Sequence, residues 1–173
     1  MVWLKVLNGK GNYHDDRALQ DALNYCMRES KTPNGLVGGW AVDPQNAAEE
    51  MALFTKLAGK EEGLQLRHFV ISFPPKTFRD HRKGFEIAKR CAQYYGENYQ
   101  IVYAIHEDTE HVHAHFVMNA VRYTDGKKYR GTKQDLYAFT AHSTKALHDA
   151  GIKSSLAYIS TKRRGHENSL SSY

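Results

Sequence analysis

The 173-residue sequence lacks several features that would place it in common classes of protein. No apolar stretch approaches the ~20 residues that a membrane-spanning helix needs, so we expect no contact with a membrane. Residues 1–5 do not begin a secretory signal, because no apolar run with a small-residue cleavage site follows them. Cysteine is scarce, with only Cys26 and Cys91. We expect buried thiols rather than a disulfide, which fits a cytoplasmic protein.

Two further signals are missing from the chain. Residues 8–12 form a polar, glycine-rich stretch, but the spacing of a phosphate-binding loop is absent and Lys10 is not followed by Ser or Thr in the required frame. The sequence contains no internal repeat. The composition, 41% hydrophobic and 25% charged, is ordinary for a globular protein. We therefore expect one domain over residues 1–155, followed by a basic, serine-rich tail over residues 156–173.

The positive charge of the chain is concentrated towards its end. Residues 1–120 hold 14 Lys and Arg against 15 Asp and Glu, whereas residues 121–173 hold 10 against 4. This distribution favours binding of a polyanion, most simply a nucleic acid, although a solvated surface with a tail has the same pattern. The basic residues with interleaved Tyr123 and Tyr129 are Arg122, Lys127, Lys128 and Arg130.

Alternating strand and helix patterns predict an α+β fold. We expect a central, mainly antiparallel, five-stranded sheet with helices over one face. The expected strands cover residues 3–7, 38–42, 66–73, 99–105 and 111–120. The expected helices cover residues 14–29, 44–58, 77–95 and 132–150, and Gly59, Gly96 and Gly151 end the last three.

One stretch, residues 106–119, carries four of the ten histidines. From His111 onward, polar and apolar residues alternate, which predicts a strand with one apolar face and one face of imidazoles. The preceding strand joins it through a tight hairpin, with His106 near the tip. The opposite face of the sheet from the helices would then carry the histidines.

Three of these histidines form a predicted metal site. His113 and His115 project from one face of one strand, and His106 reaches them across the hairpin, which gives three neutral ligands with open positions. His111 and Asp108 are placed to orient these ligands or to accept a proton. Without a metal, the carboxylates of the connecting loop would instead stabilise cationic histidines.

The run His-x-Asp-x-x-His-x-His-x-His-x-x-x-Asn from His106 to Asn119 resembles the third motif of mobilisation-type conjugative relaxases. These are HUH endonucleases (His, hydrophobic residue, His), and the run is most similar to the branch of VirD-type and plasmid-mobilisation relaxases. The family pattern also includes a tyrosine on the first helix, which Tyr25 matches. It includes a serine at a strand end before a turn, which Ser72 matches. The resemblance covers residues 3–120.

The resemblance implies a reaction with single-stranded DNA at an origin of transfer. Tyr25 would attack one phosphodiester to leave a 5′-phosphotyrosyl adduct, with Asp108 or His111 as the base and Mg²⁺ or Mn²⁺ on the three histidines. A tyrosine hydroxyl, with a pKa near ~10, needs such help at neutral pH. The DNA contacts would be Ser72, Asn119, Arg122, Lys127, Lys128 and Arg130. Relaxosome accessory proteins and a type IV secretion coupling protein are the expected partners in a bacterial cytoplasm.

Other interpretations of the same residues remain open at this point. A rolling-circle replication initiator shares the histidine motif, but its tyrosine helix usually follows the histidine strand instead of preceding it. A non-enzymatic metal-binding or DNA-binding module would keep the fold without the reaction. Tyr94 and Tyr95 are the chief rivals of Tyr25, although their position at a helix end favours packing. Relaxases usually run longer, so the chain is expected to be a truncated or minimal form.

Overall fold

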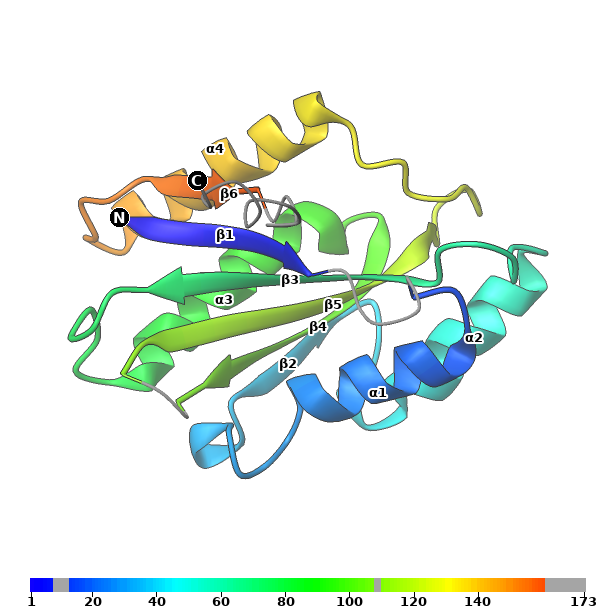
Figure 1. The fold of residues 1–173 in the computed structure, drawn as a ribbon, viewed down its shortest axis with the longest axis horizontal. Coiled ribbons are helices and arrows are strands. Elements are labelled where there is room, and N and C mark those ends of the chain that lie inside the picture. Colours follow the sequence, from blue (N-terminus) through cyan, green and yellow to red (C-terminus); the bar gives the residue numbers. More distant parts are fainter. Residues whose placement is uncertain (8–12, 108–109, 161–173) are drawn as a thin grey trace, which may run out of the picture.

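The computed structural model describes residues 1–7, 13–107 and 110–160. In this part of the chain, a six-stranded sheet has the order β2-β4-β5-β3-β1-β6 (Figure 1). All neighbouring strands are antiparallel except β1 and β6, which are parallel. The strands are β1 (Val2–Leu7), β2 (Val37–Trp40), β3 (Leu66–Phe73), β4 (Tyr99–His106), β5 (Val112–Arg122) and β6 (Leu156–Ile159). The predicted α+β class and the mainly antiparallel sheet are confirmed.

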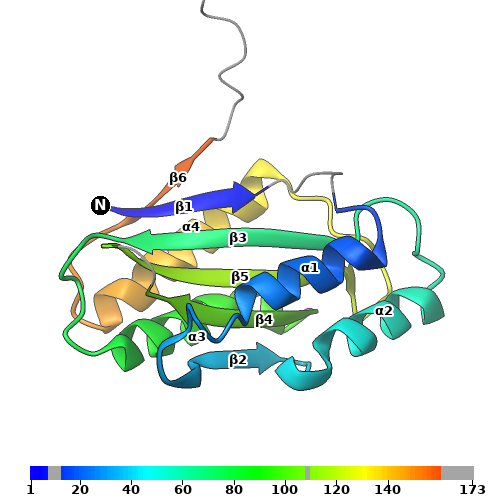
Figure 2. The same cartoon turned by 60° about the horizontal axis from the view of Figure 1, so that its bottom comes forward.

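Helices cover both faces of the sheet, so the prediction of helices over one face is wrong. On one face, α3 (His81–Gly96) and α4 (Lys133–Asp149) enclose the larger core. On the other, α1 (Asp16–Cys26) and α2 (Ala47–Leu57) enclose a second core with Val102 and Val117 (Figure 2). The second core exists because the histidine-bearing face of β5 becomes apolar at Val117, and that apolar patch must be buried.

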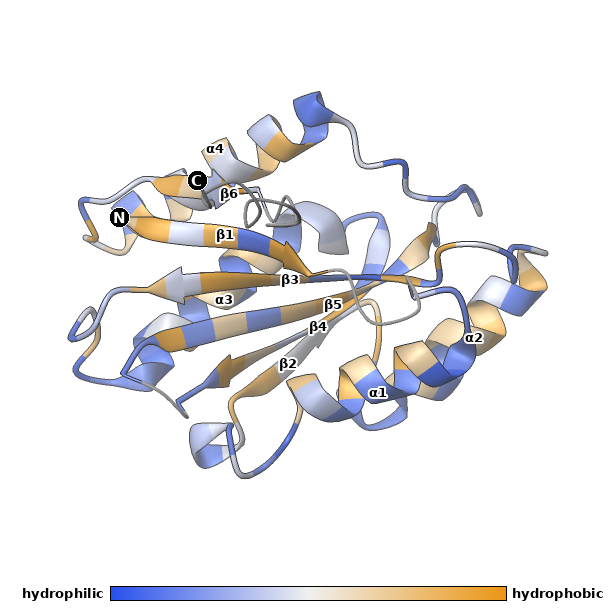
Figure 3. Cartoon of the chain, in the orientation of Figure 1, coloured by the Kyte–Doolittle hydropathy of each residue, from blue (hydrophilic) through white to orange (hydrophobic). Residues whose placement is uncertain are grey.

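The alternation of β5 is what separates the two cores. Ala114, Phe116 and Met118 are buried against α3 and α4, whereas His113, His115 and Val117 face α1 and α2. Figure 3 shows this as alternating hydrophilic and hydrophobic bands along the strand. A period of two residues therefore sends imidazoles to one side and large apolar side chains to the other.

The sheet has a sixth strand in addition to the five that were predicted. Residues Leu156–Ile159 pair in parallel with β1, from Val2 opposite Leu156 to Lys5 opposite Ile159. They were expected in the tail because four residues are too short for a clear alternation. Their pairing with β1 is a long-range contact that no local pattern specifies. The remainder of the predicted tail, residues 161–173, lies outside the described residues.

Local capping signals set the helix boundaries. The side chains of Asp15, Asp80 and Thr132 accept hydrogen bonds from backbone N–H groups in the first turns of α1, α3 and α4. Gly59 and Gly151 follow α2 and α4 with φ of 64° and 79°, a conformation that favours glycine. Cys26 and Cys91 are buried free thiols, as predicted, and burial raises both pKa values to about 12. None of the described helices is long and apolar enough to cross a membrane.

Candidate active site

The register of the central strands aligns the predicted site residues in rows across one face. His106 of β4 lies opposite His113 of β5, which lies opposite Ser72 of β3. The next row places His115 between Ala104 and Val70. Directly opposed residues of antiparallel strands share a face, so three histidines from two strands meet here, as the sequence predicted.

A fourth histidine, His68 of β3, joins this cluster. Its Nε2 lies 3.1 Å from Nδ1 of His115, and its Nδ1 lies 3.4 Å from the Tyr13 hydroxyl. His68 was not predicted as a site residue, because it is isolated from the other histidines in the sequence. It could have been predicted, because His68 and Ser72 lie on the same face of a strand that was predicted correctly.

Contacts with α1 fix the orientation of the cluster. Nε2 of His106 donates to the backbone oxygen of Cys26 at 2.7 Å, so in the neutral form of this ring the lone pair is on Nδ1. The Cys26 thiol donates to the backbone oxygen of His115 at 3.8 Å. The last turn of α1 thus contacts both β4 and β5, directly beside Tyr25.

The donor chemistry of the cluster fits a divalent metal ion. Burial, followed by electrostatic interaction with His106 and other nearby basic side chains, lowers the pKa of His115 to about 2. Burial and His106 lower the pKa of His68 to about 4. Both rings are therefore neutral, the form that binds metals. The centroids of the His106 and His115 rings lie 4.0 Å apart. Within residues 1–7, 13–107 and 110–160, however, no three His, Cys, Asp or Glu side chains already stand at ligand spacing, so binding requires side-chain rotation.

Tyr25 lies against the histidines, in the last turn of α1. Its ring centroid is 5.4 Å from the centroids of both His106 and His115, with edge-on geometry. The side chains of Arg28 and Lys31 lie over the ring at 5.6 and 5.2 Å. The ring is half-buried, which agrees with its predicted place on the flank of the helix's apolar stripe.

The cluster opens into a cavity of about 410 Å³ on the same face of the sheet. Tyr25, Ser72, His113 and His115 line it together with side chains of β1 and the edge strand β6. His111 is exposed, and its Nδ1 donates to the backbone oxygen of Phe73 at 3.1 Å. Its ring lies 6.3 Å from that of His113. Asp108, the other predicted base, lies outside the described residues.

Asn119 was predicted to contact DNA, and the structure does not support this role. Its side chain is fully buried beneath α2. Its Oδ1 accepts from the Thr55 hydroxyl at 3.2 Å and from the backbone N–H of Val121 at 3.2 Å. Its Nδ2 donates to Gln100 and to the backbone oxygen of Met51. The polar face of β5 passes under α2 before it reaches Asn119, so this amide is a structural link.

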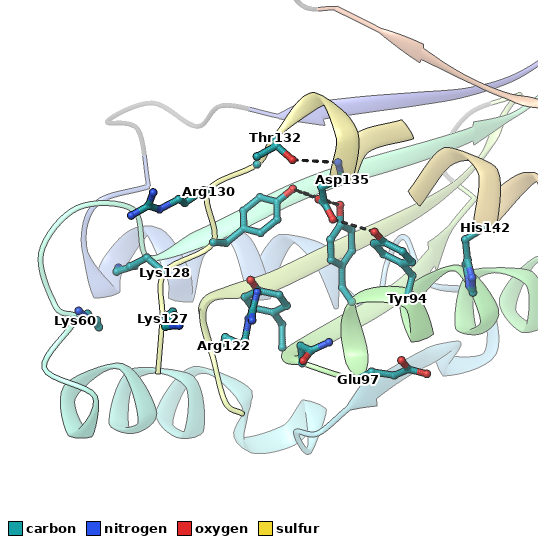
Figure 4. A pocket seen from close by; sticks show the side chains of 15 residues that line it. Lys60, Tyr94, Glu97, Arg122, Lys127, Lys128, Arg130, Thr132, Asp135 and His142 are labelled. Atoms are coloured by element: carbon teal, nitrogen blue, oxygen red, sulfur yellow. Dashed lines mark hydrogen bonds between the residues drawn. The ribbon is translucent and has the colours of Figure 1, made fainter. Parts of the chain in front are cut away.

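The four predicted basic DNA contacts gather at the opposite end of β5. Arg122, Lys127, Lys128 and Arg130 line a cavity of about 840 Å³ with Lys60 (Figure 4). At ~3.4 Å per residue, Arg122 lies about 30 Å along the strand from His113. The guanidinium of Arg122 lies 5.8 Å from the centroid of the Tyr99 ring. Lys128 donates to the backbone oxygen of Leu64.

The rival tyrosines belong to this distant cavity. The hydroxyls of Tyr94, Tyr95 and Tyr129 all donate to the Asp135 carboxylate, at 3.0, 2.8 and 2.7 Å. Burial, together with Asp135, raises the pKa of Tyr94 to about 12. Burial and neighbouring Tyr129 raise that of Tyr95 far above its ordinary value. These hydroxyls are held by hydrogen bonds to Asp135, far from the histidine cluster.

The fold and the site define an α+β domain with a histidine-lined cavity beside a helix tyrosine, and comparison with known families places it among nuclease domains. The family described as "Relaxase: MobA/VirD2-like, nuclease domain" matches residues 25–152, which is more than half of the chain. The chain belongs to this family. The resemblance seen in the histidine motif is therefore confirmed.

Several proteins of Staphylococcus aureus are similar to the chain. Two proteins named Protein rlx are 30% identical over 116 residues, which is 65% of this chain and 34% of theirs. A third Protein rlx is 27% identical over 119 residues, with 67% and 34% covered. The chain thus spans about a third of the length of these relatives. A solved structure described as "Molecular Basis of Vancomycin Resistance Transfer in Staphylococcus aureus" aligns over 68% of both chains, with a TM-score of 0.47 and 18% identity.

Proposed function

We propose that the chain cleaves single-stranded DNA at an origin of transfer, with Tyr25 as the nucleophile. The observation that carries this proposal is the position of the Tyr25 ring, 5.4 Å from both His106 and His115 and open to the same cavity. Membership of the relaxase family favours this function over a rolling-circle initiator. The order of the elements, with the tyrosine helix before the histidine strand, favours it too.

The reaction is a transesterification at phosphorus. A bond forms between the Tyr25 hydroxyl oxygen and the phosphorus, and the bond from phosphorus to the 3′ oxygen breaks. The products are a 5′-phosphotyrosyl adduct and a free 3′-hydroxyl. Asp108 or His111 takes the tyrosine proton, and the leaving oxygen gains one. Because the adduct is itself a phosphodiester, the 3′-hydroxyl can attack it in reverse and religate the strand without ATP.

The histidines hold the metal ion of the site in this proposal. A divalent ion such as Mg²⁺ or Mn²⁺ on His106, His113 and His115 would act as a Lewis acid towards the phosphate. Ser72 lies directly opposite His113 and lines the cavity, so its hydroxyl is placed to donate to a phosphate oxygen. The imidazoles and Ser72 thereby position the phosphate against Tyr25.

DNA outside the reacting phosphate binds to the distant basic cavity. Five Lys or Arg side chains line that cavity, against two carboxylates, Glu97 and Asp135. Tyr94 and Tyr129, which are only partly buried, supply aromatic surface there, and single-stranded DNA combines phosphate neutralisation with stacking on such rings. We propose relaxosome accessory proteins and a type IV secretion coupling protein as partners of the whole protein.

Adduct formation tests the nucleophile. The protein is incubated with Mn²⁺ and a labelled single-stranded oligonucleotide that spans the origin of the element encoding the chain. We expect a covalent adduct that resists denaturing electrophoresis. Tyr25→Phe removes the attacking oxygen and should form none, whereas Tyr137→Phe, on an exposed helix position, should react like the parent. Equal adduct from Tyr25→Phe would exclude this residue.

Metal binding tests the histidines separately. His113→Ala with His115→Ala should abolish both cleavage and high-affinity Mn²⁺ binding measured by calorimetry, because two of three neutral ligands are lost. His148→Ala, an exposed histidine on α4, is the matched control. A double variant that still binds Mn²⁺ and cleaves would contradict the proposed ligand set.

A further inference from the structure

The rows of residues across the sheet continue past the histidines onto β1. Trp3 of β1 lies opposite Ser72, which extends the row His106, His113 and Ser72 by one strand. Lys5 lies opposite Val70 and therefore extends the row of His115. At ~4.8 Å between strands, Trp3 lies about 10 Å from His113 on the same face.

Trp3 and Lys5 both open into the cavity that contains Tyr25. Ile159 and Leu7 line it beside them, so an apolar wall faces the imidazoles and the tyrosine. Trp3 is 41% exposed and Ile159 is also 41% exposed. Lys5 is exposed and forms no ion pair with any residue that the structure describes.

Trp3 is exposed although its strand, β1, is held firmly in the sheet. The alternate residues of β1, Val2 and Leu4, are 0% and 1% exposed. They pack in the larger core, and β1 is paired on both sides, by β3 and β6. The indole is therefore presented to solvent from a rigid platform, inside a cavity, next to a cation.

This combination is that of a base-stacking site with a phosphate contact. An aromatic ring beside a cation binds single-stranded nucleic acid, because an unpaired base can lie flat on the ring while the cation neutralises its phosphate. A base in a duplex is already stacked and offers no free face. The cavity wall thus selects an unpaired strand.

We propose that an unpaired base close to the reacting phosphate stacks on Trp3, and that Lys5 binds a phosphate beside that base. A stacked strand advances ~3.4 Å per nucleotide, so a distance of about 10 Å places this base within about three nucleotides of the reacting phosphate. The proposal deepens the proposed function and rests on it. Trp3 is a positioning residue here, and Tyr25 keeps the chemical step.

Tryptophan fluorescence tests the stacking without any cleavage. The chain has two tryptophans, and the other, Trp40, is on β2 at the opposite edge of the sheet. Its indole nitrogen donates to the backbone oxygen of Lys89. In a Tyr25→Phe background, Trp40→Phe leaves Trp3 as the sole reporter, and Trp3→Phe leaves Trp40. Titration with the origin oligonucleotide should quench the first variant saturably and leave the second unchanged. An abasic nucleotide at the stacked position should abolish the quenching.

Affinity gives a second measurement with a matched control. By anisotropy of a labelled oligonucleotide, Trp3→Ala should bind about tenfold to hundredfold more weakly than the parent, and Trp3→Phe should retain most of the affinity. Tyr158→Ala removes an aromatic of similar exposure, 42%, from β6, where it lies opposite Leu4 and so on the other face. It should bind normally.

The outcomes separate this proposal from the proposed function. If Trp3 fluorescence is unchanged while anisotropy shows saturated binding, or if Trp3→Ala binds like the parent, the stacking site is wrong. If quenching occurs but the parent protein forms no adduct, the stacking site stands and the nicking reaction is wrong. Circular dichroism of each variant verifies that it is folded. The Trp40→Phe titration tests the stacking site even if substitutions of Trp3 unfold the protein, because it leaves Trp3 in place.

Discussion

At the scale of single residues, His68 changes the description of the histidine cluster most. Its contact with Nδ1 of His115, and its own contact with the Tyr13 hydroxyl, form a chain of three side chains. When Nδ1 of His115 donates to His68, Nε2 of His115 presents its lone pair to a metal. A ring held in this way by an outer hydrogen bond keeps the tautomer and orientation that a ligand requires.

Removal of His68 is therefore expected to weaken metal binding. His68→Ala should lower the affinity for Mn²⁺ about 10- to 100-fold, as measured by calorimetry, because His115 loses its orienting partner. Tyr13→Phe should give a smaller loss, since it removes only the outer member of the chain. His142→Ala, whose histidine contacts the backbone oxygen of Arg90 far from the cluster, is the control. Unchanged affinity in His68→Ala would exclude an orienting role.

At the scale of elements, the hairpin of β4 and β5 and the last turn of α1 bring the site together. The hairpin register places His106 opposite His113, and Cys26 connects both strands to α1 through its carbonyl oxygen and its thiol. α2 acts differently, because it covers the far half of the polar face of β5. Asn119 fills this interface with four hydrogen bonds, two accepted and two donated.

The role of Asn119 predicts a change in stability without a change in DNA binding. Asn119→Ala should lower the free energy of unfolding by about 2–3 kcal/mol, because the buried Gln100 and Thr55 lose partners. Urea denaturation measures this loss. The affinity of the remaining folded protein for single-stranded DNA should equal that of the parent. A large loss of affinity at full stability would restore Asn119 as a DNA contact.

At the scale of the whole molecule, the basic cavity and the histidine cluster lie at opposite ends of the sheet. The histidine cluster lies at the end where β4 finishes and β5 begins, and the basic cavity lies where β5 ends. The basic cavity is also on the face covered by α3 and α4, whereas the histidine cluster is on the face of α1. A strand of DNA in contact with both must therefore extend more than about 30 Å, which corresponds to more than about nine stacked nucleotides. The length of the oligonucleotide should therefore affect its affinity more than its cleavage once bound.

Substitution in the basic cavity should separate binding from chemistry. Lys127→Ala with Arg130→Ala removes two exposed cations, so the affinity for single-stranded DNA should fall and the slope of log K against log salt should decrease by about 1.4. Adduct formed at saturating DNA should be unchanged, because Tyr25, the proposed nucleophile, is distant. Lys83→Ala with Lys89→Ala, exposed on α3, is the charge-matched control. An equal change in the control would show that the effect is only net charge.

The elements and the histidine motif were determined by the sequence itself, because both depend on local spacing. The alternation of β5, the caps of the helices and the hairpin at His106 are interactions between near neighbours in the chain. They were sufficient to predict the α+β class, the family and the convergence of His106, His113 and His115. Tyr25 was selected by the family pattern and by its place on the flank of a helix.

Only the tertiary structure decided which distant residues share the cavity. Trp3 and Lys5 line it, and His68 contacts His115 beside it, because β1 pairs with β3 and β3 pairs with β5. Pairing between remote strands is fixed by burial of both faces. Asn119 lies outside the cavity because α2 packs over the part of β5 that begins at Val117 and buries the second core there. The sixth strand arises in the same way, from long-range pairing with β1. Local patterns describe one strand at a time, whereas the site is a property of neighbouring strands.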